Sequence, residues 1–255
     1  APLPRVPHRL SASGEDRMRR LFSIADALSL EVTPPLIRTW LFDPPYNIGF
    51  GYGGKVNDRR SISDYEDWIG DNAAVMAEHS ENDAHLFLVI YPDIAYRLVE
   101  PIINAGWVLN QWVTWVYPSN IGHSKKRFTR ASRAVVWFTR GEPETYMRSV
   151  QQPYRNPTDR RIKQHIANGR TGVNLYDWWE INLRKNVSKG YAGWFNQLPF
   201  ELVNRIVLTT TKEGEWVGDL MAGGGTLHEV AITCGRHAFL NDIDERALEI
   251  WETIE

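Results

Sequence analysis

Short apolar runs alternate with amphipathic stretches along the chain. The runs at 36–42, 84–91, 107–117 and 133–139 have the length and the β-branched and aromatic content of strands. The stretches at 61–80, 92–106 and 198–211 show helical spacing. Ser61 or Ser63 can cap the first of these helices, and Pro92 suits the first turn of the second. This alternation predicts an α/β protein.

The pattern changes in the last part of the chain and in one long segment before it. Residues 215–221 predict a strand, 226–235 a helix ending at a glycine, and 237–244 another strand. Residues 141–195 have weak periodicity and many polar, Trp and Tyr residues, which predicts an irregular insertion. We therefore expect a loose N-terminal arm over 1–20 and one domain built from 21–140 and 196–255, interrupted by 141–195.

A glycine turn follows the strand predicted at 215–221. Gly223 to Gly225 let the backbone approach a bound molecule without a Cβ clash, and the next helix presents free N–H groups to it. Asp242 at the end of the following strand can accept hydrogen bonds from both hydroxyls of a ribose. The spacing predicts an adenosine site, with a tight turn that binds nothing as the alternative.

Two residues distinguish the classes of adenosine site. A dinucleotide-binding turn needs a third glycine where this chain has His228. Asp219, four residues before the first glycine, instead resembles the acid that ends the first strand of class I methyltransferases, in which S-adenosylmethionine lies across the turn.

The stretch DPPY, Asp43 to Tyr46, follows the strand at 36–42. An exocyclic base amine is a poor nucleophile because its lone pair is delocalised into the ring. Asp43 and the Pro44 carbonyl could each accept one N–H and push the nitrogen towards sp³ character, and Pro44 and Pro45 hold these acceptors rigidly. Tyr46 offers a face on which a base taken out of the duplex can stack. An ordinary turn after a strand is the alternative.

Together the two motifs resemble the DNA amino-methyltransferases over nearly the whole chain. The family's catalytic signature, Asp/Asn/Ser-Pro-Pro-Tyr/Phe/Trp, corresponds to DPPYN, and its acid with a Phe-x-Gly-x-Gly-like turn corresponds to DLMAGGGT. The order of the motifs resembles the β group, whose fold is circularly permuted. The resemblance implies a Rossmann-like class I sheet, with the two turns side by side on neighbouring parallel strands. It implies a catalytic half over 21–140, a target-recognition insertion over 141–195 and a cofactor-binding half over 196–255.

The resemblance also implies S-adenosylmethionine as cofactor and assigns its contacts. They fall on Asp219, Met221, Ala222, Gly223, Gly225, Thr226 and Asp242. FSIADAL at 22–28 resembles the family's Gly-Asp-x-Leu segment, which implies a strand beside that of Asp242 and places Asp26 near the adenine amino group. WFNQLP at 194–199 resembles the family's His-Pro-Thr-Gln-Lys-Pro helix start, with WFN in place of His-Pro-Thr and Leu198 in place of the lysine. Gln197 and Pro199 match this pattern and would close over the methionine end.

Charge is distributed unevenly along the chain. The net charge is −2, but residues 118–190 hold 15 Lys and Arg against 5 Asp and Glu, a local charge of +10. This predicts a basic face for a polyanion, or else a solvated basic surface. The family keeps its target-recognition region here, which implies phosphate contacts from Lys125, Lys126, Arg127, Arg130, Arg155, Arg160, Arg161 and Lys163. Further along the same stretch, Ser132-Arg133 stands where the family often has His-Glu.

The remaining chemistry is limited. The single cysteine, Cys234, excludes an internal disulfide and a cysteine-based zinc site, and its apolar setting predicts a buried structural thiol. His123 and His165 lie in basic stretches, which favours phosphate contacts or exposure over metal binding, so we expect no metal. No run reaches membrane-spanning length and no signal peptide is visible, which favours a cytoplasmic location.

The functional hypothesis is a site-specific, adenine-specific DNA methyltransferase of a restriction–modification type. It would transfer the methyl group of S-adenosylmethionine in line to N6 of a flipped adenine in double-stranded DNA. The aspartate favours adenine, because the resembling N4-cytosine enzymes more often carry serine. N4-cytosine or RNA amine methylation, a catalytically inactive nucleic-acid-binding homologue and, remotely, a nicotinamide oxidoreductase stay open, as does a homodimer.

Overall fold

A computed structural model describes residues 18–51, 58–119, 122, 125–184 and 193–254. The N-terminal arm expected over 1–20 lies outside the described residues up to residue 17, and His123 lies outside them too. No helix in the described ranges is long and apolar enough to cross a bilayer.

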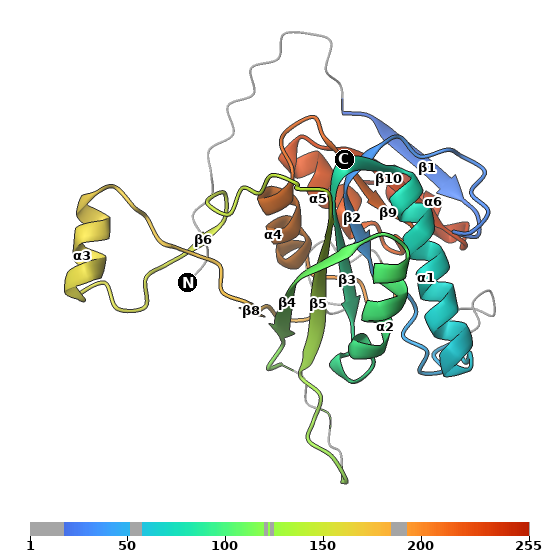
Figure 1. The fold of residues 1–255 in the computed structure, drawn as a ribbon, viewed down its shortest axis with the longest axis horizontal. Helices are drawn as coiled ribbons and strands as arrows, with labels where there is room; N and C mark the ends of the chain where they lie inside the picture. The colour runs from blue at the N-terminus through green and yellow to red at the C-terminus, as the bar shows by residue number, and fades with distance from the viewer. Residues whose placement is uncertain (1–17, 52–57, 120–121, 123–124, 185–192, 255) are drawn as a thin grey trace.

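One mixed sheet organises the molecule (Figure 1). Its strand order is β1 (Arg20–Ile24), β10 (His237–Asp242), β9 (Trp216–Asp219), β2 (Ile37–Phe42), β3 (Ser80–Ile90), β5 (Ser132–Arg140), β4 (Val108–Val116) and β8 (Trp178–Glu180). The neighbouring strands β1, β10, β9, β2 and β3 are parallel to one another. Strand β5 is antiparallel to β3 and β4, and β8 is parallel to β4. The predicted α/β fold is confirmed, and β1, which ends at Ile24 within the segment 22–28, is the expected strand beside that of Asp242.

Helices cover both faces of the sheet. Helices α1 (Ile62–Glu78) and α2 (Pro92–Asn104) pack against alternate strand residues such as Trp40 and Leu86. Helices α4 (Phe200–Thr210), α5 (Thr226–Cys234) and α6 (Arg246–Glu252) share a second core with the intervening residues, such as Leu41 and Phe87. Because successive side chains of a strand point to opposite faces, the sheet lies between two apolar layers.

The middle of the sheet is tightly packed around β2, whose six residues are all buried. A Cβ on Gly218 of β9 would come within 2.5 Å of the Trp40 ring, so a larger residue there would push the two strands apart. The Trp40 indole N–H donates a hydrogen bond to Ser80 Oγ at 3.0 Å, which ties β2 to the start of β3. This packing fixes the register of β2 against β9.

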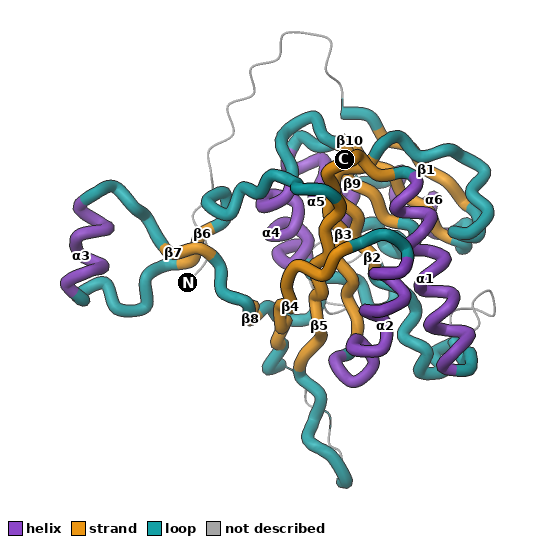
Figure 2. The backbone as a smooth tube through the Cα atoms, in the orientation of Figure 1, coloured by secondary structure: helices purple, strands orange, loops and turns teal. Residues whose placement is uncertain are grey.

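The segment over 141–195 is more ordered than its sequence predicts. It contains β6 (Gln151–Gln152) and β7 (Val173–Asn174), which pair with each other, and helix α3 (Arg160–Ala167) between them. These elements form an arm, residues 151–174, that stands away from the main body (Figure 2). After the arm, the chain returns to the main sheet as β8. The expectation of an irregular insertion over 141–195 is therefore wrong.

The structure corrects one smaller expectation and adds one helix. Cys234 is only partly buried, because it lies near the end of α5, where its thiol contacts Asn204 Oδ1 at 3.2 Å. Its burial still raises the pKa of the thiol. Helix α6 was not predicted, and its Trp251 fills the core behind the glycine turn with a fully buried ring.

Candidate active site

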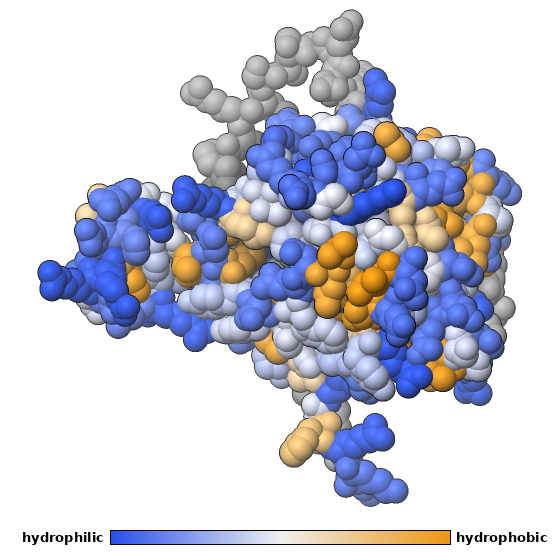
Figure 3. Space-filling view, viewed as in Figure 1, coloured by the Kyte–Doolittle hydropathy of each residue, from blue (hydrophilic) through white to orange (hydrophobic). Residues whose placement is uncertain are grey.

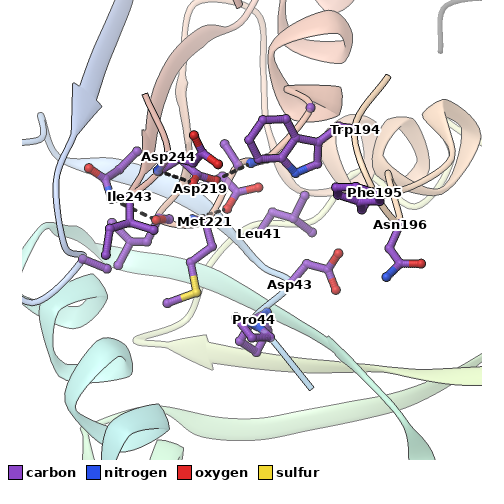
Figure 4. A pocket seen from close by; sticks show the side chains of 18 of the residues that line it. Leu41, Asp43, Pro44, Trp194, Phe195, Asn196, Asp219, Met221, Ile243 and Asp244 are labelled. Carbon is purple, nitrogen blue, oxygen red and sulfur yellow. Dashed lines mark hydrogen bonds between the residues drawn. The ribbon is translucent and has the colours of Figure 1, made fainter. Parts of the chain in front are cut away.

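The two sequence motifs lie side by side at one end of the sheet. β2 pairs with β9 in parallel, and Leu41 stands opposite Asp219. Asp43 therefore leaves β2 next to the point where β9 enters the glycine turn. Both turns line a single pocket, in which Asp43 and Pro44 face Asp219 and Met221 (Figure 4).

The carboxylates of the glycine turn shape their own backbone. Asp242 Oδ2 accepts a hydrogen bond from the Gly223 N–H at 2.8 Å, and Asp242 Oδ1 accepts one from the Asp244 N–H at 2.9 Å. Asp219 Oδ1 accepts one from the Met221 N–H at 2.9 Å. The backbone of Gly223 has a φ of 49°, a conformation that a side chain would strain. These acids hold the turn in shape before any ligand arrives.

A buried amide fastens the neighbouring strand ends together. Asn241 is fully buried, and its Nδ2 donates hydrogen bonds to the carbonyls of Ala25 and Leu220, each at 3.0 Å. The Ala222 N–H donates to the Asn241 carbonyl at 2.9 Å. The ends of β1, β9 and β10 are thus tied at the floor of the pocket, which also places Asp26 on its wall.

Burial perturbs the acids of the pocket. It raises the pKa of Asp43 to about 6, although Arg133 and a hydrogen bond from Tyr46 act to lower it. It raises the pKa of Asp219 well above its ordinary range, and the charges of Asp43 and Asp242 raise it further. Carboxylates crowded in a poorly solvated pocket favour a bound cation, which would relieve their repulsion.

The turn at residues 43–46 is backed by a buried cation. The Tyr46 hydroxyl donates a hydrogen bond to Asp43 Oδ1 at 2.7 Å, and the Tyr46 ring meets Tyr91 edge to face at 4.7 Å. The Arg133 guanidinium lies 5.1 Å from the Tyr46 ring centre and 5.0 Å from that of Trp115. Arg133 is only 5% exposed, so its charge acts on Asp43 with little screening by water. Arg133 belongs to the Ser132-Arg133 pair, which stands where the family often has His-Glu.

Most of the residues expected at the catalytic turn and at the cofactor lie together. Those that line the pocket are Asp26, Asp43, Pro44, Pro45, Tyr46, Gln197, Asp219, Met221, Ala222, Gly223, Thr226 and Asp242. Pro199 and Gly225 do not line it. Pro199 is the N-cap residue of α4, and a Cβ on Gly225 would come within 2.6 Å of Trp251, so this glycine serves packing behind the turn. Leu198, which replaces the family lysine, does line the pocket.

Sequence reasoning missed the aromatic residues that cover the glycine turn. Trp194 lies so close that a Cβ on Gly223 would come within 2.6 Å of its Nε1, and one on Gly224 within 2.8 Å of its Cβ. Phe195 lines the same wall and meets Phe50 edge to face at 5.7 Å. Trp68 and Tyr91 line the opposite side, near the catalytic turn. The only signal was the WFN stretch in place of the family's His-Pro-Thr.

The basic residues fall on two projections. Lys125, Lys126, Arg127 and Arg130 lie between β4 and β5, where the structure describes residues 118–119, 122 and 125–131, which we name the β4–β5 projection. Arg155, Arg160, Arg161 and Lys163 lie on the arm, where all four side chains are exposed. Figure 3 shows hydrophilic side chains over much of the arm's visible surface. On the arm, Arg155 stacks 5.0 Å from the ring centre of Trp178 in β8.

Comparison with known proteins agrees with this geometry. The chain is 25% identical over 216 residues to the type II methyltransferase M.HpaI of Haemophilus parainfluenzae, a match that covers 82% of this chain and 64% of the relative. The chain thus spans less than two thirds of that relative. The fold superposes on the cytosine-N4-specific PvuII DNA methyltransferase with a TM-score of 0.69 at 17% identity, covering 92% of each chain.

A second solved structure has the same fold. It is a complex of M1.HpyAVI with S-adenosylmethionine, with a TM-score of 0.62 at 12% identity, covering 91% of this chain and 98% of the other. The family described as N6_N4_Mtase, DNA methylase, matches residues 37–253, which include both turns and the arm between them. The chain therefore belongs to the N6_N4_Mtase family of DNA methylases.

Proposed function

We propose that this protein transfers a methyl group from S-adenosylmethionine to the exocyclic amine of a base in double-stranded DNA, with N6 of adenine as the acceptor. The observation that carries the proposal is the single pocket shared by the Asp43–Tyr46 turn and the glycine turn. One wall offers acceptors for an amine, and the other offers acids and a glycine backbone for an adenosyl cofactor. Family membership over residues 37–253 supports the same reaction.

The residues present fit S-adenosylmethionine. Its sulfonium is a cation, and the neighbouring carboxylates of Asp219 and Asp242 provide an electrostatic partner for it. Asp242 would bind the ribose hydroxyls, Asp26 would approach the adenine amine, and Gln197 would lie towards the methionine end. Met221, Ala222, Gly223 and Thr226 would line the rest of the site. When bound, the cofactor supplies an electrophilic methyl group.

The chain's own residues would prepare the acceptor amine. Asp43 Oδ1 already accepts a hydrogen bond from Tyr46, so we assign Oδ2 to one N–H of the amine and the Pro44 carbonyl to the other. Both acceptors pull the nitrogen lone pair out of conjugation, and the two prolines keep them in place. The Tyr46 ring would hold the flipped base. No covalent enzyme intermediate is required, because the nitrogen would attack the methyl group directly. The bond between the methyl carbon and the sulfur would break, the neutral thioether S-adenosylhomocysteine would leave, and the amine would release one proton to solvent.

We further propose that the fold is circularly permuted relative to enzymes in which the cofactor turn comes first. Here the Asp43 turn precedes the glycine turn in the chain, and the first strand, β1, completes the sheet beside the late strand β10. The arm and the β4–β5 projection, both rich in Lys and Arg, would bind the phosphates of double-stranded DNA. Their positions between the two turns suit a target-recognition region.

N4 of cytosine is the second candidate acceptor. The PvuII enzyme that shares this fold is cytosine-N4-specific. Adenine is favoured by the aspartate in the catalytic turn, since serine is more frequent in the N4-cytosine enzymes that the chain resembles. Both bases present an exocyclic amine next to a ring nitrogen, so the same acceptors could serve either.

The test is incubation of the protein with labelled S-adenosylmethionine and unmethylated genomic DNA, followed by nucleoside analysis and mapping of the modified bases. We expect N6-methyladenine at one recurring sequence. N4-methylcytosine would replace the adenine proposal with the second candidate. Label in RNA but not in DNA would contradict the DNA substrate, and retention of DNA without any label would indicate a nucleic-acid-binding homologue that does not catalyse.

A further inference from the structure

Phe128, on the β4–β5 projection, is entirely exposed to solvent. Its relative exposure is 103%, whereas the next most exposed large hydrophobic residues are Tyr96 at 65% and Leu36 and Val108 at 62% each. Burying such a ring in an apolar setting is favourable, and the described part of the chain does not bury it. Four cations, Lys125, Lys126, Arg127 and Arg130, surround it in the sequence, and residues 118–131 contain no Asp or Glu.

The base of the projection lies at the catalytic turn. β5 begins beside the end of β3, with Ala134 opposite Ile90. Arg130 stacks 3.9 Å from the ring centre of Tyr91 and pairs with Asp93 at the start of α2. Tyr91 in turn contacts Tyr46, which is hydrogen-bonded to Asp43. A continuous chain of contacts therefore leads from Arg130 to the catalytic aspartate.

Phe128 is two residues beyond Arg130, within about 7 Å along an extended backbone. Figure 1 shows the projection leaving the sheet at the lower end of β4 and β5. A DNA duplex bound over the Asp43 pocket would come against this projection. An acidic protein surface would bind the cations but not the apolar ring, and an apolar surface would bind the ring but not the cations. Nucleic acid binds both, because its phosphates bind cations and its bases stack on aromatic rings.

We propose that Phe128 is a wedge that inserts between base pairs next to the target and occupies the space that the flipped base leaves. This inference rests on the proposed function and identifies how the same site gains access to its base. Extruding a base requires unfavourable unstacking, and apolar wedges in other DNA-binding proteins offset that cost. The flanking cations would hold the phosphates on either side of the opening.

The test uses the full chain and duplexes that carry the target sequence found by base mapping. One duplex is fully paired, and the other has a mismatch opposite the target base, which removes most of the cost of extrusion. We expect Phe128→Ala to lower kcat/KM on the paired duplex roughly tenfold or more, and to lower kcat/KM on the mismatched duplex only slightly. Phe128→Leu, which retains an apolar wedge, should fall between wild type and Phe128→Ala.

Two control variants separate the wedge from other roles. Tyr96→Ala removes an exposed ring on α2 and should leave kcat/KM unchanged on both duplexes. Lys125→Ala should weaken binding to both duplexes equally, because a phosphate contact does not depend on base pairing. An equal loss for Phe128→Ala on the two duplexes would overturn the wedge. Absence of methyl transfer by the wild-type protein on either duplex would instead overturn the proposed function, and the wedge with it.

Discussion

Arg133 shows how one residue can set the chemistry of the catalytic turn. It is a buried cation on β5, placed against the rings of Tyr46, Tyr91 and Trp115. Burial lowers the pKa of Arg133, but the neighbouring Tyr46 and Asp43 more than offset this, so it stays charged. Its charge lowers the pKa of Asp43, which burial has raised. The ionisation of Asp43 therefore depends on its burial, on Arg133 and on Tyr46.

The first prediction concerns the pH dependence of methyl transfer. With the pKa of Asp43 raised to about 6, its carboxylate is ionised above that pH and protonated below it. The activity should therefore fall as the pH drops through about 6. Arg133→Met removes the charge that favours the carboxylate, so the acid limb of kcat/KM should move to higher pH, while Arg133→Lys should stay near wild type.

Arg38→Met is the matched control for this pH profile. Arg38 is also buried, and it lies on β2 near its start, where it donates a hydrogen bond to the Asp83 carbonyl at 2.6 Å. Its loss should destabilise the fold without moving the acid limb. An acid limb that is the same in wild type and Arg133→Met would contradict the positioning role of Arg133.

Single residues were predicted where their backbone or their chemistry is distinctive. Asp43, Asp219 and Asp242 each follow or end a strand, so their convergence follows from a parallel sheet. Arg133 could not be assigned, because its role depends on rings from other elements that only the fold brings to it. The role of His228 also depends on contacts that only the fold provides. Its side chain is fully buried, its ring centre lies 5.2 Å from that of Phe22 in β1, and burial lowers its pKa to about 4.

At the scale of elements, the glycine turn and the segment that covers it form one unit. Trp194 closes over Gly223 and Gly224 from the stretch that precedes α4. Trp251 of α6 supports the turn from behind and donates a hydrogen bond from its indole N–H to the Gly223 carbonyl at 2.9 Å. The turn is thus held between two tryptophans, and its space for a ligand depends on both.

The second prediction tests this arrangement with a pair of glycines. Gly223→Ala and Gly214→Ala both place a side chain at positive φ, at 49° and 80°, which costs about 1–2 kcal/mol of stability in each. Only the Cβ at Gly223 meets Trp194, whereas a Cβ at Gly214 meets nothing within 4 Å. Calorimetric titration should show S-adenosylmethionine binding weakened roughly tenfold or more in Gly223→Ala and unchanged in Gly214→Ala. Equal affinities in the two variants would argue against a role for the covered turn.

Elements with strong periodicity were predicted well, and short or context-dependent ones were not. Helix α1 begins after Ser61, whose side chain accepts a hydrogen bond from the Asp64 N–H, as its capping sequence suggests. Strand β8 has three residues and forms only because β4 offers it an edge, so periodicity cannot reveal it. Helix α3 has no buried residue and lacks an apolar stripe in contact with the core.

At the scale of the molecule, charge is separated between the body and its projections. The segment 118–190 carries +10, while the rest of the chain, which includes the acidic pocket, carries −12. In Figure 1 the arm and the β4–β5 projection leave the body on different sides. A polyanion could be held by the two basic projections while one base enters the acidic pocket.

The third prediction concerns the arm. Replacing Arg160, Arg161 and Lys163 by glutamine keeps polar side chains on α3 but removes three charges. DNA affinity should fall, and the slope of log affinity against log salt should become shallower by about 0.9 for each phosphate that the variant no longer neutralises. Arg97→Gln, on α2 and paired with Glu66, should leave the slope unchanged. If the triple variant keeps the wild-type slope, the arm does not bind phosphates.

The central claim is that one pocket holds the methyl donor on the glycine turn and the acceptor amine on Asp43. The most direct test is Asp43→Ala, measured both by calorimetric titration with S-adenosylmethionine and by methyl transfer to DNA. We predict transfer reduced roughly a thousandfold or more, with cofactor affinity within a few-fold of wild type. Loss of cofactor binding in step with activity, or transfer that persists without the Asp43 carboxylate, would contradict the account.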